Sequence, residues 1–202
     1  AIGLAGGVMV NAVANSVVPG FFTGTTIPGG TRTSFVSRSP LTGIWGEATV
    51  GGTWGAEFRC TGHDGLVILG AASSPVYLWI NDDDVEIRPA ERLWGKDTYE
   101  AGDLLLEETD PKAKVAAIGQ AGENLVRIAA VMVEGRHARA AGRTGMGAVM
   151  GAKKLKAIVV RGTRGVPVYN PAGLMGWALR KTNEVPAMFG IFTVYGTSGS
   201  IE

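Results

Sequence analysis

Apolar segments along this chain are short, and turns rich in glycine, proline and aspartate separate them, a pattern typical of β-strands. On this basis we predict strands at residues 17–18, 32–37, 65–70, 114–118, 127–133 and 157–161. Two further segments, 76–80 and 85–88, flank the acidic turn 81–84 and are predicted to form a hairpin. An acidic turn could bind a hard cation, but a solvated turn is favoured because no further ligands lie nearby in the sequence.

Helical patterns occur at residues 97–108, 147–153 and 171–183. Asp97 and Asn170 are the expected N-caps of the first and the last of these helices, and Pro171 suits a first helical turn. Strands and helices do not alternate cleanly, which argues against a parallel sheet wound with helices.

The chain weakly repeats itself at an offset of 92 residues, for example where Pro75-Val76-Tyr77 matches Pro167-Val168-Tyr169. Chance among abundant Gly, Ala and Val is the alternative, but a duplication is favoured. It predicts two related strand-rich halves, at about 15–90 and 110–170. The loop expected at 46–52 then mirrors the loop expected at 137–144, and a ligand would lie between the halves.

Composition limits the classes of function. The formal net charge is +1, which gives no electrostatic reason to expect nucleic acid or an anionic membrane as a partner. No apolar run reaches the length of a membrane span, and nothing resembles a signal peptide. Cys60 is the only cysteine, so a disulfide within the chain and a four-cysteine metal site are excluded, which fits a reducing, cytoplasmic location. The chain starts at Ala1 without methionine, and we expect a fragment or one domain of something longer.

Candidate chemistry concentrates in the run from Arg139 to Gly151, which sets two arginines among four glycines and three alanines. Small residues let a backbone approach a ligand closely and point its N–H groups at an anion. Arginine binds phosphate or a planar heterocycle bidentately. The run therefore predicts a site for a large, flat, anionic cofactor, and Arg32, beside Gly29-Gly30-Thr31, is a candidate third clamp.

An alternative interpretation of the same run is a dinucleotide site. Gly145-x-Gly147-x-x-x-Gly151 follows a predicted strand and precedes a predicted helix, and Arg161 and Arg164 would favour NADP over NAD. The predicted strand ends at Val133, however, too far from the glycines for a Rossmann turn.

Other reactive residue types give weaker signals. The two histidines, His63 and His137, have no obvious third metal ligand and are interpreted as local hydrogen-bonding residues. Four glutamates could serve as acids or bases, without a reason to choose among them: Glu47, Glu57, Glu123 and Glu134.

Five separated motifs occur in the order in which the aldehyde:ferredoxin oxidoreductase family carries them. They are Ser39-Pro40-Leu41-Thr42-Gly43, Gly55-Ala56-Glu57-Phe58, Leu93-Trp94-Gly95-Lys96-Asp97, Gly122-Glu123-Asn124-Leu125-Val126-Arg127, and Arg139-Ala140-Ala141-Gly142-Arg143 with Gly147-Ala148-Val149-Met150-Gly151. The chain resembles the N-terminal domain of that family from about Val17 to Gly196. The resemblance implies an α+β fold of two similar strand-rich halves that forms a base for a pterin cofactor, with residues 170–202 as the helical start of a connection to later domains.

The resemblance also implies cofactors and roles. Family members hold tungsten or molybdenum through two pterin dithiolenes beside a [4Fe-4S] cluster. Arg32 resembles the arginine that bridges cofactor and cluster. Ala48, Thr49 and Gly51 fall in the first pterin loop, and Thr49 stands where the family often has an asparagine that helps to hold magnesium between the pterin phosphates. The second pterin loop is matched by Arg139, Ala140, Ala141, Gly142 and Arg143.

The family's cluster cysteines and the groups near its metal lie on later domains, so no catalytic or metal-ligating residue is expected in this chain. The implied function is cofactor binding in an enzyme that oxidises aldehydes to carboxylic acids and passes electrons to ferredoxin or an iron–sulfur subunit, as a homo-oligomer. The alternatives are a family member with another substrate, such as a sugar-phosphate aldehyde or an aryl-CoA, a stand-alone non-catalytic pterin-binding subunit, and an NADP-binding domain. One departure is the segment before Arg139, which is two residues longer than usual.

Overall fold

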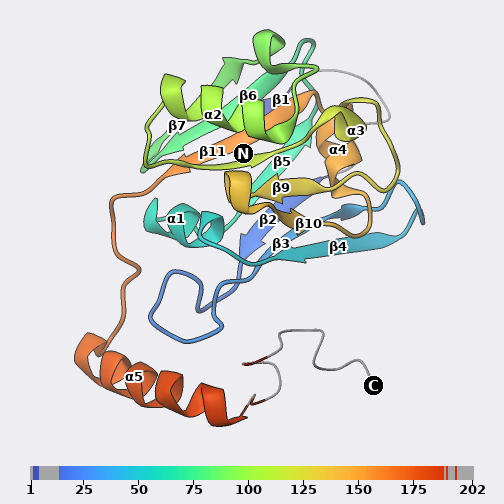
Figure 1. Ribbon diagram of the computed structural model, residues 1–202. Coiled ribbons are helices and arrows are strands. Elements are labelled where there is room, and N and C mark those ends of the chain that lie inside the picture. The colour runs from blue at the N-terminus through green and yellow to red at the C-terminus, as the bar shows by residue number, and fades with distance from the viewer. Residues whose placement is uncertain (1, 5–13, 189, 191–193, 195–202) are drawn as a thin grey trace.

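The computed structural model describes residues 2–4, 14–188, 190 and 194, and its body consists of two β-sheets with short helices (Figure 1). The strands are β1 (Ile2–Leu4), β2 (Asn15–Pro19), β3 (Thr33–Arg38), β4 (Trp45–Val50), β5 (Leu66–Gly70), β6 (Val76–Asn81), β7 (Asp84–Pro89), β8 (Lys114–Ala117), β9 (Val131–Val133), β10 (Arg139–Ala141) and β11 (Leu155–Arg161). The helices are α1 (Trp54–Cys60), α2 (Thr98–Glu108), α3 (Gln120–Glu123), α4 (Met146–Ala152) and α5 (Pro171–Met188), with short 3-10 helices η1 (Glu91–Leu93) and η2 (Gly135–His137). The predicted α+β class is confirmed.

The two sheets share one topology. The first has the strand order β1-β5-β2-β3-β4, and the second has the order β10-β9-β8-β11-β6-β7. In the first sheet β1 runs parallel to β5, and the remaining neighbours are antiparallel. In the second sheet β6 runs parallel to β11, and β8, β9 and β10 follow as antiparallel neighbours. Strands β6, β11, β8, β9 and β10 thus take the places of β1, β5, β2, β3 and β4, which confirms two similar strand-rich halves.

The repeat is clearest around two helices. Helices α1 and α4 each have 7 residues and begin 92 positions apart, and each connects an edge strand to a more central one. The sheets divide the chain between β5 and β6, so residues 76–89, which the repeat assigned to the first half, lie in the second sheet. The Pro-Val-Tyr match was misleading because Val76 begins β6, whereas Val168 lies in an irregular segment.

The main core lies between the two sheets. Phe35 of β3 and Ile158 of β11 belong to one buried cluster, together with Trp54 of α1 and Met146 of α4. The Trp54 indole nitrogen donates a hydrogen bond to the main-chain oxygen of Ile158 at 3.2 Å, which ties the first half to the central strand of the second. A second cluster packs α2 on the other face of the second sheet and contains Tyr77, Trp79, Leu93, Leu105 and Val159.

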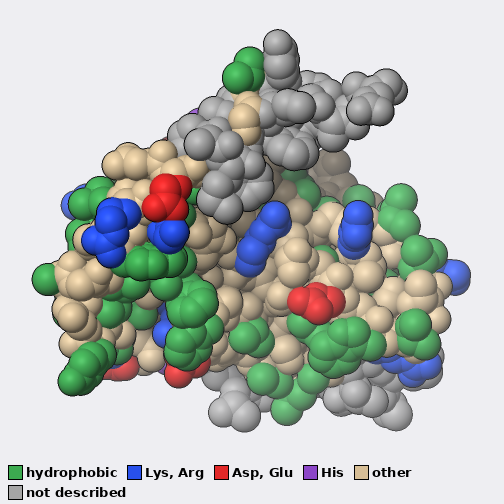
Figure 2. All heavy atoms as spheres, turned by 90° about the horizontal axis from the view of Figure 1, so that it is seen from below, with side chains coloured by type: hydrophobic (Ala, Val, Ile, Leu, Met, Phe, Trp, Pro, Cys, Tyr) green, Lys and Arg blue, Asp and Glu red, His purple; other side chains and the backbone are tan. Residues whose placement is uncertain are grey.

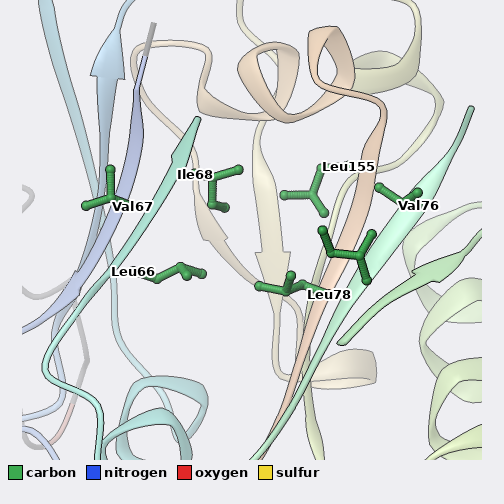
Figure 3. Close-up of a pocket in the computed structure, with 7 residues that line it drawn as sticks. Leu66, Val67, Ile68, Val76, Leu78 and Leu155 are labelled. Carbon is green, nitrogen blue, oxygen red and sulfur yellow. The ribbon is translucent and has the colours of Figure 1, made fainter. Parts of the chain in front are cut away.

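A small cavity also lies between the sheets, where side chains of β5, β6 and β11 face one another (Figure 3). Its volume is only about 10 Å³, and Leu66, Ile68, Leu78 and Leu155 are among the apolar residues that line it. A space of that size admits at most one water, and apolar walls offer that water no partners. We therefore regard this cavity as a packing gap and not as a binding site.

Two predicted loops are wrong, since residues 46–52 and 137–144 contain the edge strands β4 and β10. The strand predicted at 127–133 is also too long, because only β9 is extended there. The reason is the contact with α4: Gly147 donates a hydrogen bond from its main-chain N–H to the oxygen of Ala129 at 2.9 Å. The turn itself is closed by the main-chain N–H of Ala129, which donates to the oxygen of Val126 at 2.8 Å.

The predicted helix caps are present. Asp97 accepts hydrogen bonds through Oδ1 from the main-chain N–H groups of Tyr99 and Glu100 at 2.9 and 2.8 Å. Asn170 accepts one from Gly173 at 2.9 Å, and α5 continues beyond the predicted end to Met188. Helix α5 lies apart from the two sheets at the end of an extended connection (Figure 1). Most of the predicted connection after Met188 lies outside the described residues.

The predicted β6–β7 hairpin is also present, and its acidic turn binds protein groups. Asp82 accepts hydrogen bonds from Thr163, and Asp83 pairs with Arg164; these contacts lower the pKa of both carboxyl groups. In the described ranges, no three His, Cys, Asp or Glu side chains gather as metal ligands. None of the helices described is both long and apolar enough to cross a membrane.

Candidate cofactor site

A cavity of about 700 Å³ lies where the edge strands of the two halves approach each other. Strand β4 lies at one edge of the first sheet, and β10 lies at one edge of the second. The residues that line the cavity are Arg32, Glu47, Thr49, Ala140, Gly142 and Arg143. Figure 2 shows this side of the molecule from below, with separate basic side chains standing on a surface of mostly uncharged atoms. The cavity thus lies between the halves, where the repeat predicted a ligand.

The alternation of strand residues decides which side chains reach the cavity. In β4, Glu47 and Thr49 are exposed, whereas Ala48 is buried and points into the core. In β10, Ala140 is exposed and Ala141 is buried. Ala48 and Ala141 can therefore offer a ligand only their main-chain groups. Because the side chain of Ala140 is small, it takes up little of the space in the cavity.

Two lining arginines, Arg32 and Arg143, give the site its charge, and Arg139 directly precedes the lining residue Ala140. Arg32, Arg139 and Arg143 are exposed, and in the part of the chain that the structure describes none of their guanidinium groups has an ion pair or a hydrogen bond. Glu47 is the one carboxylate among the lining residues, and it accepts a hydrogen bond from the Ser34 hydroxyl at 2.7 Å. Fixed cations outnumber carboxylates, so the cavity favours an anion.

The backbone at one end of the site is held by hydrogen bonds, and at the other end the two halves are in contact. The main-chain oxygen of Arg32 accepts from Gly20 N at 2.7 Å and from the Thr23 hydroxyl at 2.9 Å, which closes the loop before β3. On the other side, the Arg139 guanidinium lies 3.8 Å from the point where a Cβ on Gly51 would stand. Gly51 and Arg139 are therefore neighbours, although they come from different halves.

The glycines of the 139–151 run divide into two groups. A Cβ on Gly142 would meet only the Ala140 side chain, at 3.7 Å, so the backbone there is open to a ligand. A Cβ on Gly145, Gly147 or Gly151 would instead lie 1.9 to 2.4 Å from a main-chain oxygen. These three glycines let α4 pack directly against neighbouring backbone. They do not line the cavity, so the dinucleotide pattern in the sequence has a packing origin.

The four glutamates have different surroundings. Glu57 accepts hydrogen bonds from Arg161 and from the main-chain N–H of Gly162, at 2.9 and 3.0 Å. Glu123 forms a buried ion pair with Lys156. Glu134 binds the N-terminus of α1. Only Glu47 lines the cavity, and its position two residues before Thr49 in an alternating strand is the signal that could have selected it.

The two histidines lie apart from each other and from any cluster of metal ligands in the described residues. The Nδ1 atom of His63 is 2.9 Å from the Thr61 hydroxyl, as expected of a local hydrogen-bonding residue. His137 is exposed in η2, which contains the extra length before Arg139. Burial raises the pKa of the Cys60 thiol, and one cysteine supplies a single thiolate where a cluster needs several.

The residues of the cavity fit a phosphate-bearing, flat group. Arg32 and Arg143, which have no protein acceptors among the described residues, can bind its anionic oxygens, and the open backbone at Gly142 can approach a ring closely. The volume of about 700 Å³ lies within the range of cofactor sites.

Comparisons with known proteins show which family the chain resembles. The family described as "Aldehyde ferredoxin oxidoreductase, N-terminal domain" matches residues 13–162. A tungsten-containing aldehyde ferredoxin oxidoreductase of Pyrococcus furiosus is 44% identical over 186 residues, which are 90% of this chain and 30% of that protein. From the same organism, the WOR-like subunit of an aliphatic sulfonate oxidoreductase is 42% identical over 151 residues, 68% of this chain and 24% of that one.

A solved structure is similar over most of the fold. It is the active site complex BamBC of benzoyl coenzyme A reductase with 1,5-dienoyl-CoA, with a TM-score of 0.82 and 38% identity, covering 87% of this chain and 26% of the matching one. The chain spans only about a third or less of the length of these relatives. The match to the family covers well over half of the chain, and the chain belongs to the aldehyde ferredoxin oxidoreductase family, of which it forms the N-terminal domain.

Proposed function

We propose that this chain holds a tungsten or molybdenum bis-pterin cofactor in an enzyme that oxidises aldehydes to carboxylic acids. The observation that carries the proposal is the cavity between β4 and β10, with Arg32 and Arg143 in its lining and no protein acceptor for either among the described residues. Membership of the family supports the same conclusion, because the relative from Pyrococcus furiosus is tungsten-containing. The activity belongs to the whole protein, of which this domain supplies one wall of the site.

The arginines and the exposed backbone have separate tasks in the proposal. Arg139 and Arg143 bind phosphate and pterin from the second half, and Arg32 reaches the cofactor from the loop before β3. Ala140, Ala141 and Gly142 offer main-chain groups, as do Ala48 and Gly51 on the other side. Such preorganised donors hold charge without reorganising during the reaction. The side chain of Thr49 faces the cavity beside them, where it could contact a magnesium ion between the phosphates only through its short hydroxyl.

The bound metal would supply the two-electron redox chemistry, with an iron–sulfur cluster and then ferredoxin, or an iron–sulfur subunit, as acceptors. The cluster ligands would come from outside this chain, since Cys60 is its only cysteine. The domain itself orients the cofactor and offsets its negative charge. Because a nearby positive charge stabilises the reduced, more anionic form, the arginines also favour reduction of the cofactor.

A second candidate is the same domain in an enzyme with another substrate. The relatives named for aliphatic sulfonate and for benzoyl coenzyme A are 42% and 38% identical to this chain, close to the 44% of the aldehyde enzyme. Substrate contacts would lie in the parts of those proteins that this chain does not cover. Turnover of aldehyde, sulfonate and aryl-CoA by the purified full-length enzyme separates these candidates.

Substitution of the arginines tests the cofactor-binding role. In the full-length protein, Arg139→Ala and Arg143→Ala should each lower the pterin and metal retained per folded chain by about tenfold, as expected for the loss of one charge-assisted hydrogen bond. Arg136→Ala is the matched control, because that side chain is 77% exposed and pairs with Asp103. Unchanged pterin in both variants would refute the assigned site, whatever reaction the enzyme catalyses.

A further inference from the structure

We propose that Glu134 is a positioning residue, which fixes the two cofactor-binding edges of the halves relative to each other. The proposal rests on the proposed function, because it concerns the same site. Glu134 does not line the cavity. Its carboxylate instead joins the β9–β10 hairpin of the second half to the turn between β4 and α1 in the first.

The contacts of the carboxylate cross from one half to the other. Glu134 Oε1 accepts hydrogen bonds from the main-chain N–H groups of Thr53 and Trp54, at 2.6 and 3.0 Å. The Thr53 hydroxyl also lies 3.1 and 3.0 Å from the two carboxylate oxygens. These N–H groups belong to the first turn of α1, which has no cap from its own residue Thr53. A carboxylate from the other half therefore replaces the local cap.

The neighbouring turn accommodates this contact in a specific way. Gly52 has φ +112°, and a Cβ there would lie 2.6 Å from Glu134 Oε1. A side chain at this position would thus displace the carboxylate. The preceding residue, Gly51, lies against the Arg139 guanidinium. The Gly51-Gly52 turn of the first half is therefore contacted by Glu134 and by Arg139, both from the second half.

Glu134 and Arg139 stand at the two ends of one hairpin connection. Arg139 pairs with Val133 in the antiparallel ladder, so Glu134 is the first residue of the connection and Arg139 the first residue after it. The backbone adopts the left-handed region at both ends of this connection, with φ of 68° at Glu134 and 45° at Ala138. Residues other than glycine rarely adopt this conformation unless their surroundings impose it. We infer that the carboxylate contact imposes it, and so sets the position from which Arg139 reaches the cofactor.

The proposal thus separates binding from positioning at this site. Arg143 lines the cavity and the proposed function assigns Arg139 to the same ligand, whereas Glu134 determines where Arg139 and the Gly51-Gly52 turn lie with respect to each other. A residue that orients a ligand-binding group typically changes affinity by about 10- to 100-fold when it is removed. Removal of the Glu134 carboxylate should therefore lower the cofactor content as removal of the Arg139 guanidinium does. Loss of a helix cap alone would lower only the stability of the fold.

The test measures pterin and tungsten per folded chain in the full-length enzyme, beside the melting temperature. Glu134→Ala should retain about tenfold less of both than wild type. Glu134→Gln keeps an oxygen acceptor for Thr53 and Trp54 and should stay within about twofold of wild type. Glu107→Ala, on the exposed face of α2, is the matched control for removing a carboxylate.

A double-mutant cycle distinguishes positioning from a structural role. If Glu134 acts through Arg139, adding Arg139→Ala to Glu134→Ala should lower the content by no more than about twofold further. The proposal would be overturned if the double variant lost pterin and metal by the product of the two single-variant factors. It would also be overturned if Glu134→Ala had a lowered melting temperature but normal pterin content. If that variant does not fold, Gly52→Ala disturbs the same contact from the other half, and its normal pterin content would overturn it equally. A wild-type enzyme without pterin or metal would instead refute the proposed function itself.

Discussion

At the scale of single residues, Lys156 and Glu123 form a buried ion pair. The side chain of Lys156 is 0% exposed and that of its partner Glu123 is 4% exposed. Lys156 also donates to the main-chain oxygen of Lys96 at 2.8 Å, and Glu123 accepts from Gly95 N at 2.8 Å. The pair thus links the loop before α2, which contains Gly95 and Lys96, to Lys156 of β11 and Glu123 of α3. Each group has the opposite charge and a further hydrogen bond as partners, which helps a buried pair to be tolerated.

Breaking this pair should be far more harmful than removing it. Glu123→Gln leaves the Lys156 ammonium buried without a counter-charge and should lower the free energy of unfolding by about 3–5 kcal/mol. The double variant Glu123→Leu with Lys156→Met removes both charges and should regain most of that loss. Urea denaturation of the three proteins checks this. Equal losses in the single and double variants would mean that the hydrogen bonds, and not the charges, stabilise this region.

Lys153 gives a prediction about pH. Its side chain is fully buried, Nζ donates to the main-chain oxygen of Gly70 at 2.8 Å, and desolvation lowers its pKa from the usual 10.5. The unfolded chain therefore binds this proton more tightly than the folded chain. Stability contributed by this group should rise as pH increases through the folded pKa toward 10.5. Lys153→Met removes this titration, so its free energy of unfolding relative to that of wild type should fall as the pH increases over that range. Denaturation of both proteins at several pH values measures the difference, and a difference independent of pH would contradict the prediction.

At the scale of elements, close packing of backbone decides what α4 tolerates. A Cβ on Gly151 would lie 1.9 Å from the main-chain oxygen of Gly122 in α3. Gly151→Ala should therefore destabilise the protein by about 3 kcal/mol or more, since a backbone atom must move. Gly102→Ala in α2 is the matched control: nothing lies within 4 Å of its Cβ position, so the free energy of unfolding should rise by about 0.5–1 kcal/mol. Thermal unfolding of both variants provides the measurement, and equal effects would refute the packing role.

Elements with large apolar residues and explicit caps could be predicted from the sequence. Strands β5, β6, β8 and β11 and helices α2 and α5 were found in this way. Strands β4 and β10 were missed because glycine and alanine occupy most of their inward positions, namely Gly46, Ala48 and Ala141, and such residues give almost no strand signal. Helix α1 was missed as well, although Trp54 and Phe58 are four residues apart and both are buried. Its first turn is capped by Glu134, which is 80 positions away and therefore invisible to a local pattern.

At the scale of the whole molecule, duplication explains where the cavity lies. Each half ends its sheet in an edge strand, β4 or β10, and the two edges approach each other across the core. The 92-residue repeat in the sequence predicted two halves with a ligand between them, and the cavity between β4 and β10 has that placement. The contributions of Glu47 and Glu134 could not be predicted, because they depend on strand alternation and on a contact between halves. Motif resemblance indicated Arg32, Ala48, Thr49, Gly51 and residues 139–143. Of these, Arg32, Thr49, Ala140, Gly142 and Arg143 line the cavity, whereas Ala48, Gly51, Arg139 and Ala141 do not.

The most direct test of the central claim is the metal and pterin content of the purified full-length protein. We predict tungsten or molybdenum together with a bis-pterin, at two pterins per metal atom, released on denaturation and detected by elemental analysis and pterin fluorescence. A folded, full-length protein that contains neither metal nor pterin after expression in a host that makes the cofactor would contradict the claim.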